Sequence, residues 1–490
     1  MNSQNKIFGR IFAADTWKSW STHSLDVDPL PGEYSVHFFD TNDHLIGVAR
    51  DILGLQPVYY TLNGELKVFS TLREAAQSVS SLSINWDYLY SIMADNFTLL
   101  DQSPFKEVRR LPPGHLLFKE NNKWLTRPYF LKIKPQDPIH FRDVFLDVMN
   151  DRATRHSNFV LSFSGGFDSS LILASLLKQN IKAKAVTLLF PHEESSEKAA
   201  LDSFEKKWGV CFEKIEVPEI KSGIYDWRAN DCFYYIPTET MFNPLLEYAQ
   251  KNKIQDVWFG FGADEVFTLN SCLLSTLLLS GEWASFKNAF IQTSKDSSLP
   301  SAIYAIFRDL APKSLKMTLA LVVKNTSRLP FEQVLHYKKI ARLNRLQRMS
   351  DNPIQNEIEE RLYHSGSIAF IAEQSYELAS LYGLHFSYPY LDIRLIAMAL
   401  NMRPQDFYNF KQHKFLLRTQ FKDVLPSEIV QNSSRQTYNK WLLEAWVKQD
   451  EIFKSLLPSE YRPVYHEGAN LNSVYDNAKL VYLAQFLNRK

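Results

Sequence analysis

Cysteine is scarce in this chain, and long apolar runs are missing from it. Only three cysteines, Cys211, Cys232 and Cys272, occur among 490 residues, which excludes a disulfide framework and provides no CxxC pair for zinc. The most apolar stretches, residues 273–279 and 317–323, are far shorter than the roughly 20 residues of a membrane-spanning helix. The polar beginning, MNSQNKIFGR, lacks the apolar core of an export signal. We therefore expect a cytoplasmic protein with no membrane partner.

An excess of charge of one sign is also missing, since 55 lysines and arginines stand against 54 aspartates and glutamates, a formal net charge of +1. A near-neutral chain lacks the basic footprint of a DNA-binding protein, so we expect no DNA partner. Glycine and proline are few, at 16 and 22, whereas 45% of the residues are hydrophobic. This composition excludes a disordered or collagen-like chain, and the length predicts two or three domains.

The sequence pattern divides the chain into a β-rich part and an α/β part. Short alternating segments separated by turn signals such as TNDH and NG predict an antiparallel β-rich domain over residues 1–130. Residues 131–140 include LKIKPQDP, with two prolines, and are typical of a linker. Over residues 141–490, strand-like apolar runs such as NFVLSF and KAKAVTLLF alternate with helical patterns. This alternation predicts a parallel α/β sheet, with a helical insert at about 269–350.

The segment SFSGGFDSS, between a strand-like run and a helical pattern, is the most specific motif in the chain. Gly165 and Gly166 permit close approach of the backbone to an oxyanion, and the helix that follows points its positive end at it. Ser164 and Ser169 supply hydroxyl donors. Asp168 has the wrong charge for a phosphate contact unless it holds a Mg²⁺ ion that bridges phosphate oxygens. The loop therefore predicts a nucleotide and a metal, although it is not a Walker motif; a glycine turn with an aspartate cap is the alternative.

Segments on both sides of this loop carry a family resemblance. SGGFDS resembles the SGGxDS signature of the ATP-pyrophosphatase (PP-loop) families, which cleave ATP between its α- and β-phosphates. Six further segments resemble, in the same order along the chain, motifs of the glutamine-hydrolysing asparagine synthetase family. They are RDILGLQPVYY (50–60), FSTLREA (69–75), PFKEVRRLPPG (104–114), FGFGADEVF (259–267), YPYLDIR (388–394) and KFLLR (414–418).

The resemblance implies an α/β fold in which a C-terminal PP-loop parallel sheet with helical additions follows a smaller, β-rich and degenerate Ntn-glutaminase-like domain. It also implies ATP and Mg²⁺ as cofactors, with Asp168 and Asp264 as metal ligands. The implied ATP-binding residues are Ser164, Gly165, Gly166, Asp168 and Ser169 in the loop, together with Leu188 and Gly260, which would contact the adenosine through backbone groups.

The chain departs from the family's pattern at several functional positions. Position 2 is Asn2, and no cysteine precedes Cys211, so the thiol nucleophile for glutamine hydrolysis is missing. Phe261 stands where the family's SGEGSDE has a glutamate. The family's phosphate-binding lysine has no clean counterpart in this chain. These differences predict a synthetase that does not take its amine from glutamine.

Because the chain differs from the family's pattern, other residues must stabilise the pyrophosphate and remove the proton from the amine, and three residues are candidates. Arg435 and Lys440 are the candidate cations that would neutralise the departing pyrophosphate, and solvated surface charges are the alternative. His385 falls where the family often has a glutamate. A histidine near its ordinary pKa of about 6.5 is suited to removing a proton from an attacking ammonium, and a histidine without function is the alternative.

A synthetase without glutaminase must take its amine from the same substrate or from a second one. This pattern resembles lasso-peptide cyclases, which adenylate an acidic side chain of a peptide and join it to the peptide's N-terminus. The aromatic run at 233–235 and Phe261 favour an apolar peptide site, with core packing as the alternative for each. The resemblance implies an AMP-forming ligase that closes a macrolactam on a peptide substrate, with a leader-binding protein and a leader protease as partners. A β-lactam synthetase, an ammonia-dependent asparagine synthetase and a non-catalytic binding protein of the same fold are the alternatives.

Overall fold

The computed structural model describes most of the chain. The described residues are 5–12, 20, 30–62, 65–129, 133–190, 194–217, 239–270, 272–296, 298–310, 332–348, 352–409, 412–431, 454–455, 457 and 471–487.

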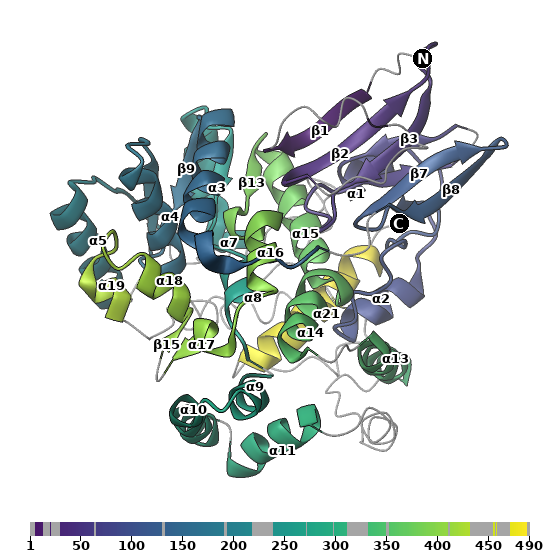
Figure 1. The fold of residues 1–490 in the computed structure, drawn as a ribbon. Helices are drawn as coiled ribbons and strands as arrows, with labels where there is room; N and C mark the ends of the chain where they lie inside the picture. The colour runs from purple at the N-terminus through teal and green to yellow at the C-terminus, as the bar shows by residue number, and fades with distance from the viewer. Residues whose placement is uncertain are drawn as a thin grey trace.

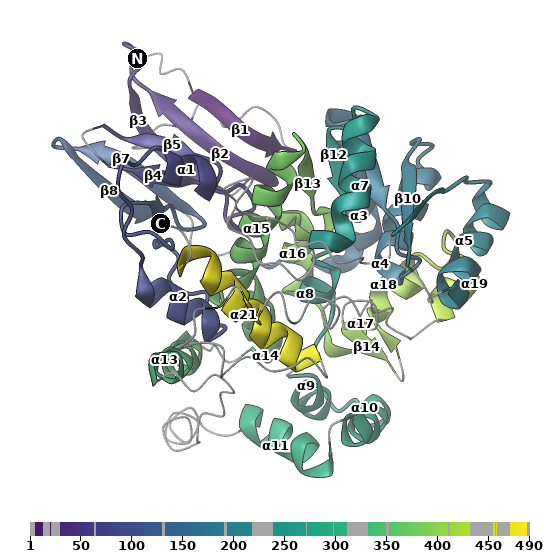
Figure 2. The same cartoon turned by 180° about the vertical axis from the view of Figure 1, so that it is seen from behind.

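Two antiparallel sheets form the N-terminal domain; Figure 1 labels the strands of the larger one, and Figure 2 also labels β4 and β5 of the smaller one. The larger sheet has the strand order β1-β2-β3-β7-β8 and the smaller one β5-β4-β6. Val48 and Leu117 of the larger sheet pack with Tyr60 of the smaller one, so the two sheets share an apolar layer. The elements are β1 (Asn5–Ile11), β2 (Gly32–Phe39), β3 (Leu45–Arg50), β4 (Tyr59–Thr61), β5 (Lys67–Phe69), β6 (Arg109–Arg110), β7 (His115–Glu120) and β8 (Lys123–Pro128), with the helices α1 (Leu72–Gln77) and α2 (Trp86–Met93).

A five-stranded sheet with the order β11-β10-β9-β12-β13 lies at the centre of the C-terminal part, and every neighbouring pair in it is parallel. The three central strands β10, β9 and β12 are largely buried, which explains why they read as continuous apolar runs rather than alternating ones, whereas the edge strand β11 (EKIE) is mostly exposed. Leu161 packs in the cluster that includes α3 and α4, whereas Val160 packs in the cluster that includes α7 and α15. The strands are β9 (Phe159–Ser162), β10 (Lys184–Leu189), β11 (Glu213–Glu216), β12 (Asp256–Trp258) and β13 (His385–Ser387).

The remaining elements of the C-terminal part are mainly helical, as the sequence predicts, so the predicted α/β fold class is confirmed. Next to the sheet lie α3 (Phe141–Arg155), α4 (Phe167–Lys178), α5 (Glu194–Trp208), α7 (Glu239–Lys251) and α8 (Ala263–Phe267). Then come α9 (Leu273–Leu279), α10 (Trp283–Asp296), α11 (Leu299–Leu310), α13 (Glu332–Arg348), α14 (Pro353–Glu359), a π-helical turn (Glu360–His364) and α15 (Ser367–Leu381). The last are α16 (Ile393–Ala399), α17 (Pro404–Phe407), the short strands β14 (Tyr408–Asn409) and β15 (Gln412–His413), α18 (Phe415–Gln420), α19 (Ser427–Gln431) and α21 (Leu471–Leu487).

A buried ionic contact joins the two domains. Glu373 of α15 accepts hydrogen bonds from Arg50 at 2.9 Å and from Arg110 at 2.6 Å, and all three side chains are almost fully buried. Removal of one partner from a buried pair leaves an uncompensated charge, at a cost of about 3–5 kcal/mol. The arginines of the RDILG and RRLPPG segments therefore fix the N-terminal domain against α15, which packs on the parallel sheet.

The last helix of the chain packs against the N-terminal domain, as Figure 2 shows for α21 and α2. Leu480 and Leu483 of α21 belong to the same buried cluster as Leu89 and Ile92 of α2. The C-terminal helix and the α1–α2 region of the N-terminal domain thus share one core. None of the helices in the described ranges combines the length and the apolar composition that a membrane crossing requires.

Glu377, one turn beyond Glu373 on α15, predicts a pH-dependent contribution to stability. Its carboxylate accepts the backbone N–H groups of Leu72 at 2.9 Å and Arg73 at 3.2 Å, where α1 begins. Burial raises the pKa of Glu377 to about 7 from its usual 4.5. Because the folded protein holds this proton more tightly than the unfolded chain, the stabilising contribution is complete below the usual pKa and is lost as the pH rises through about 7.

We expect Glu377→Gln to remove this pH dependence. The free energy of unfolding of the wild type, relative to the variant, should fall by a few kcal/mol between about pH 4.5 and about pH 7, since one pKa unit is worth about 1.4 kcal/mol. Denaturant unfolding curves at several pH values measure the difference. Glu247→Gln, at an exposed position of α7, is the control and should follow the wild type; parallel wild-type and Glu377→Gln profiles would contradict the assignment.

Candidate active site

The candidate site lies at the carboxyl edge of the parallel sheet, where the loops after β9 and β12 leave side by side. The two strands are neighbours, with Val160 opposite Val257 and Leu161 opposite Trp258. In open parallel sheets ligands bind at this edge. The SFSGGFDSS loop follows β9, and the FGFGADEVF segment follows β12, so the topology brings two motifs together that lie about a hundred residues apart.

The serine–glycine loop is held by its own hydroxyl groups. Gly165 has φ +69°, in the left-handed region that favours glycine. The N–H of Ser164 donates to Oγ of Ser169 at 3.2 Å, and the N–H of Gly166 donates to Oγ of Ser164 at 3.4 Å. Helix α4 starts immediately afterwards at Phe167, so its unsatisfied N–H groups and positive end face this loop. The loop from Ser164 to Ser169 thus offers N–H and hydroxyl donors of the kind that could bind an anion.

Gly260 lies against the start of α4. A Cβ at this position would be 3.0 Å from Cβ of Asp168 and 3.1 Å from the backbone nitrogen of Ser169, so a side chain would force α4 to shift. Leu188 lies on β10, on the other side of β9, and belongs to the apolar cluster against which Phe259 packs. Both residues therefore flank the loop, on opposite sides of β9.

Three charged side chains meet beside the loop. Nζ of Lys414 is 2.6 Å and 2.7 Å from the two carboxylate oxygens of Asp168 and 2.9 Å from Oδ1 of Asp264. Asp168 is in the first turn of α4 and Asp264 is in the first turn of α8. Oδ1 of Asp264 also accepts a hydrogen bond from the hydroxyl of Thr268 at 3.1 Å. Burial raises the pKa of Asp168 above its usual value, against the opposing effect of the Lys414 ammonium.

The two carboxylates fit the predicted magnesium site. Their oxygens already surround one point, where a cation is held, and carboxylate oxygens are the protein ligands that Mg²⁺ prefers. Within the described ranges no group of three or more His, Cys, Asp or Glu side chains converges. Mg²⁺ is commonly held by one or two carboxylates together with substrate phosphates, and this donor set matches that pattern.

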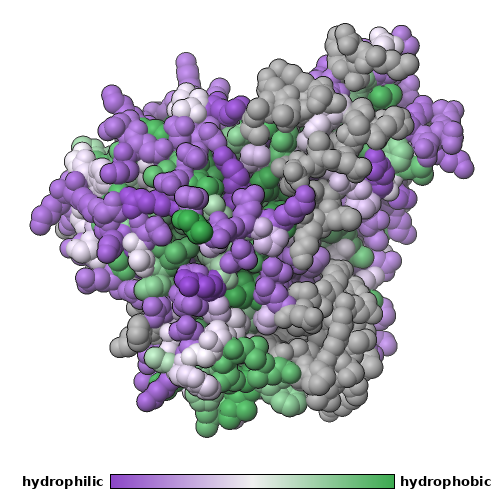
Figure 3. Space-filling model, in the orientation of Figure 1, coloured by the Kyte–Doolittle hydropathy of each residue, from purple (hydrophilic) through white to green (hydrophobic). Residues whose placement is uncertain are grey.

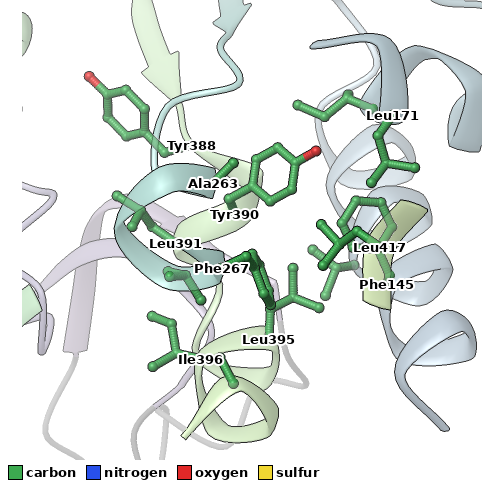
Figure 4. Packing of buried hydrophobic residues seen from close by; sticks show 14 of the residues in the cluster. Phe145, Leu171, Ala263, Phe267, Tyr388, Tyr390, Leu391, Leu395, Ile396 and Leu417 are labelled. Atoms are coloured by element: carbon green, nitrogen blue, oxygen red, sulfur yellow. The ribbon is translucent and has the colours of Figure 1, made fainter. Parts of the chain in front are cut away.

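Tyr390, in the YPYLDIR segment, supports the loop from behind. Its hydroxyl donates to the backbone carbonyl of Asp168 at 2.9 Å, and its ring is fully buried. Figure 4 shows this ring between Phe267 and Ala263 of α8 and the side chain of Leu171 on α4. The YPYLDIR segment therefore supports the first turns of α4 and α8, which carry Asp168 and Asp264.

The structure does not bring His385 to this site. His385 opens β13 and lies opposite Asp256, at the amino end of the strands, whereas the loop leaves from the carboxyl end. Its ring contacts that of Tyr376, and burial together with the Arg10 charge lowers its pKa. The parallel register thus corrects the expectation that His385 accepts a proton at the site.

The other predicted site residues divide into two groups. Phe261 lies at the carboxyl edge, in edge-to-face contact with Tyr388 at a centroid distance of 5.5 Å. Arg435, Lys440 and the aromatic run at 233–235 lie outside the described residues, so their roles stay predictions. Lys414 was not predicted as a site residue; the only signal was its place as the first residue of KFLLR.

The sequence also matches known families and proteins. The family described as asparagine synthase matches residues 140–462, and the glutamine amidotransferase domain matches residues 14–130. An asparagine synthetase [glutamine-hydrolyzing] of Brassica oleracea is 26% identical over 266 residues, which cover 49% of this chain and 40% of the relative.

Two further relatives are similar over shorter segments. Asparagine synthetase [glutamine-hydrolyzing] 2 of Lotus japonicus is 29% identical over 167 residues, covering 32% of this chain and 24% of the relative. The amidase chyE of Penicillium rubens is 23% identical over 222 residues, covering 39% and 32%. The chain thus spans no more than about two fifths of the length of these relatives. Because the asparagine synthase match extends over well more than half of the chain and includes the serine–glycine loop, Asp264 and Lys414, this chain belongs to the asparagine synthase family.

Proposed function

We propose that this protein is an ATP-dependent, AMP-forming amide ligase that closes a macrolactam on a short peptide. The observation that carries the proposal is the convergence of Asp168, Asp264 and Lys414 beside an anion-binding loop. Such a site suits a triphosphate with its metal, and the family match supports amide-bond formation. ATP would be the nucleotide, and Mg²⁺ would neutralise charge on the phosphates when bound.

The residues of the site would act by holding the triphosphate and its charge. The N–H groups at the start of α4 and the hydroxyls of Ser164 and Ser169 would bind phosphate oxygens, and Asp168 and Asp264 would hold the metal. An oxygen of the substrate carboxylate attacks the α-phosphorus, and the bond from this phosphorus to pyrophosphate breaks. The amine then attacks the acyl carbon, loses a proton, and AMP leaves. Because the activated carboxylate and the amine belong to the same bound peptide, the second step is effectively unimolecular.

Two features support a peptide rather than a free amino acid as the substrate. Phe261 replaces an acidic residue of the resembling motif and packs against Tyr388, so this pair of rings adds an apolar contact to the carboxyl edge where the motif would place a charge. Large apolar side chains are also exposed on the insert, and Figure 3 shows a hydrophobic surface over the region of α9–α11. They include Leu279, Trp283, Leu299, Ile303, Tyr304 and Phe307. Helix α9 contacts α17, the helix that precedes the segment with Lys414, so the insert packs against a part of the chain that leads to the site.

The amine would come from the peptide itself, since no cysteine lies in residues 14–130, which match the amidotransferase domain. A peptide that reaches the enzyme without its leader requires a protease, and delivery by a leader-binding protein fits the same route. We place the enzyme in the cytoplasm, where ATP and Mg²⁺ are available.

The proposal is tested with purified protein, ATP, Mg²⁺ and a peptide that has a free N-terminus and an acidic residue several positions along. We expect AMP, pyrophosphate and a product lighter by one water, detected by mass spectrometry. The same peptide with an acetylated N-terminus should support ATP–pyrophosphate exchange without cyclisation, because only the second step needs the amine. Replacing the acidic residue by its amide should abolish the exchange.

Small-molecule substrates provide the contrary outcomes. Glutamine should yield no glutamate above a blank without enzyme. If β-amino acids, or aspartate with ammonia, support AMP formation and peptides never do, the protein is a small-molecule synthetase of the same family.

Gly260→Ala tests the contact between the two motif loops. The added methyl group would push against Asp168 and the N–H of Ser169, so the loop and α4 must move apart by a few tenths of an ångström. We expect ATP–pyrophosphate exchange to fall on the order of ten- to a hundredfold, as small misplacements of reacting groups do. Gly209→Ala is the control: its φ of +65° imposes backbone strain, but nothing lies within 4 Å, and the exchange rate should stay. An unchanged rate in Gly260→Ala would contradict the placement of the triphosphate.

A further inference from the structure

The ammonium of Lys414 occupies the point on which the two acidic side chains converge. It contacts both oxygens of Asp168 and one of Asp264, all within 2.9 Å. The Lys414 side chain is 8% exposed, whereas Asp168 is 26% and Asp264 49% exposed. The lysine is therefore the most buried member of the trio.

The backbone holds Lys414 in this position. Its φ of 57° and ψ of 40° are in the left-handed region, which costs a residue with a side chain roughly 1–2 kcal/mol. Strain of this kind persists where the surrounding structure fixes it, and it gathers at functional sites. Here Arg418 donates to the carbonyls of His413 at 2.9 Å and Val430 at 2.8 Å, and Leu417 is buried in the core. The segment around Lys414 is thus anchored on both sides.

A lysine and a divalent cation cannot occupy this point together. Two carboxylates this close repel each other when no cation lies between them, particularly where burial lowers the local dielectric constant. In the structure the ammonium provides that cation. A metal that binds the same oxygens must displace it, and the flexible four-carbon side chain of lysine allows the displacement.

We infer that Lys414 holds Asp168 and Asp264 together while the nucleotide site is empty, and that its ammonium moves to phosphate oxygens when a metal-bound nucleotide enters. The inference rests on the proposed function and assigns Lys414 as a positioning residue of the metal site. It has a consequence for the order of binding. The metal alone competes with the ammonium and binds weakly, whereas a metal–triphosphate complex brings a new partner for the displaced charge.

The inference is tested by titrating the empty protein with Mn²⁺ and following free Mn²⁺ by electron paramagnetic resonance, without nucleotide or peptide. We expect Lys414→Met to bind Mn²⁺ at least about tenfold more tightly than the wild type, since the variant lacks the ammonium that competes for the same carboxylate oxygens. Lys422→Met, at an exposed position two residues beyond α18, is the matched control and should bind like the wild type. Adding Asp168→Asn to Lys414→Met should reverse the gain.

The outcomes separate this inference from other roles of Lys414. If Lys414 is only structural, Lys414→Met lowers the melting temperature and leaves Mn²⁺ affinity unchanged, which overturns the inference. Lys414→Gln, which still hydrogen-bonds to carboxylates, should give the same gain in affinity if the methionine variant does not fold. Because the titration uses neither ATP nor peptide, failure of the cyclisation assay does not alter its result, and an unchanged affinity does not refute the ligase.

Discussion

The ammonium of Lys414, shared by two carboxylates, is the interaction on which the site depends. It connects the first turn of α4, the first turn of α8 and the segment before α18, which come from three distant parts of the chain. Without a cation between them, Asp168 and Asp264 would repel each other across the ends of β9 and β12. The parallel sheet places the two carboxylates, Tyr390 supports one of them from behind, and the charge of the lysine makes their closeness stable.

Buried charge is also what joins the domains. Glu373 accepts from Arg50 and Arg110, and Glu33 of β2 accepts from Arg152 of α3 at 2.6 Å. Two of these arginines belong to segments that resemble the glutamine-hydrolysing family, although the chain has no cysteine near them. Their contacts give a physical reason for those segments that needs no glutaminase: they hold the β-rich domain against the C-terminal α/β part, where buried pairs are costly to break.

Local patterns predicted that the SFSGGFDSS loop lies between a strand and a helix, because glycine, serine and aspartate act within a few residues. The parallel sheet was predicted from the alternation of strands and helices, and Asp264 became a candidate only through the family resemblance of its segment. The contact of Lys414 with Asp168 could not be predicted in this way, because the two residues are 246 positions apart and no local pattern links them. His385 was misplaced because it lies close to a site motif in sequence, while β13 puts it at the far end of the strand. The packing of α21 against α2 could not be predicted either, because the sequence of an apolar helix does not show which hydrophobic core it joins.

The most direct test is a crystal structure of the protein with Mg²⁺ and α,β-methylene-ATP, an analogue that the proposed reaction cannot cleave. We expect the triphosphate over the start of α4, with Ser164 and Ser169 on its oxygens. We also expect Asp168 and Asp264 on the metal and the Lys414 ammonium on phosphate. A nucleotide bound elsewhere, or a triphosphate at α4 with Lys414 still between the two carboxylates and no metal on them, would contradict this placement.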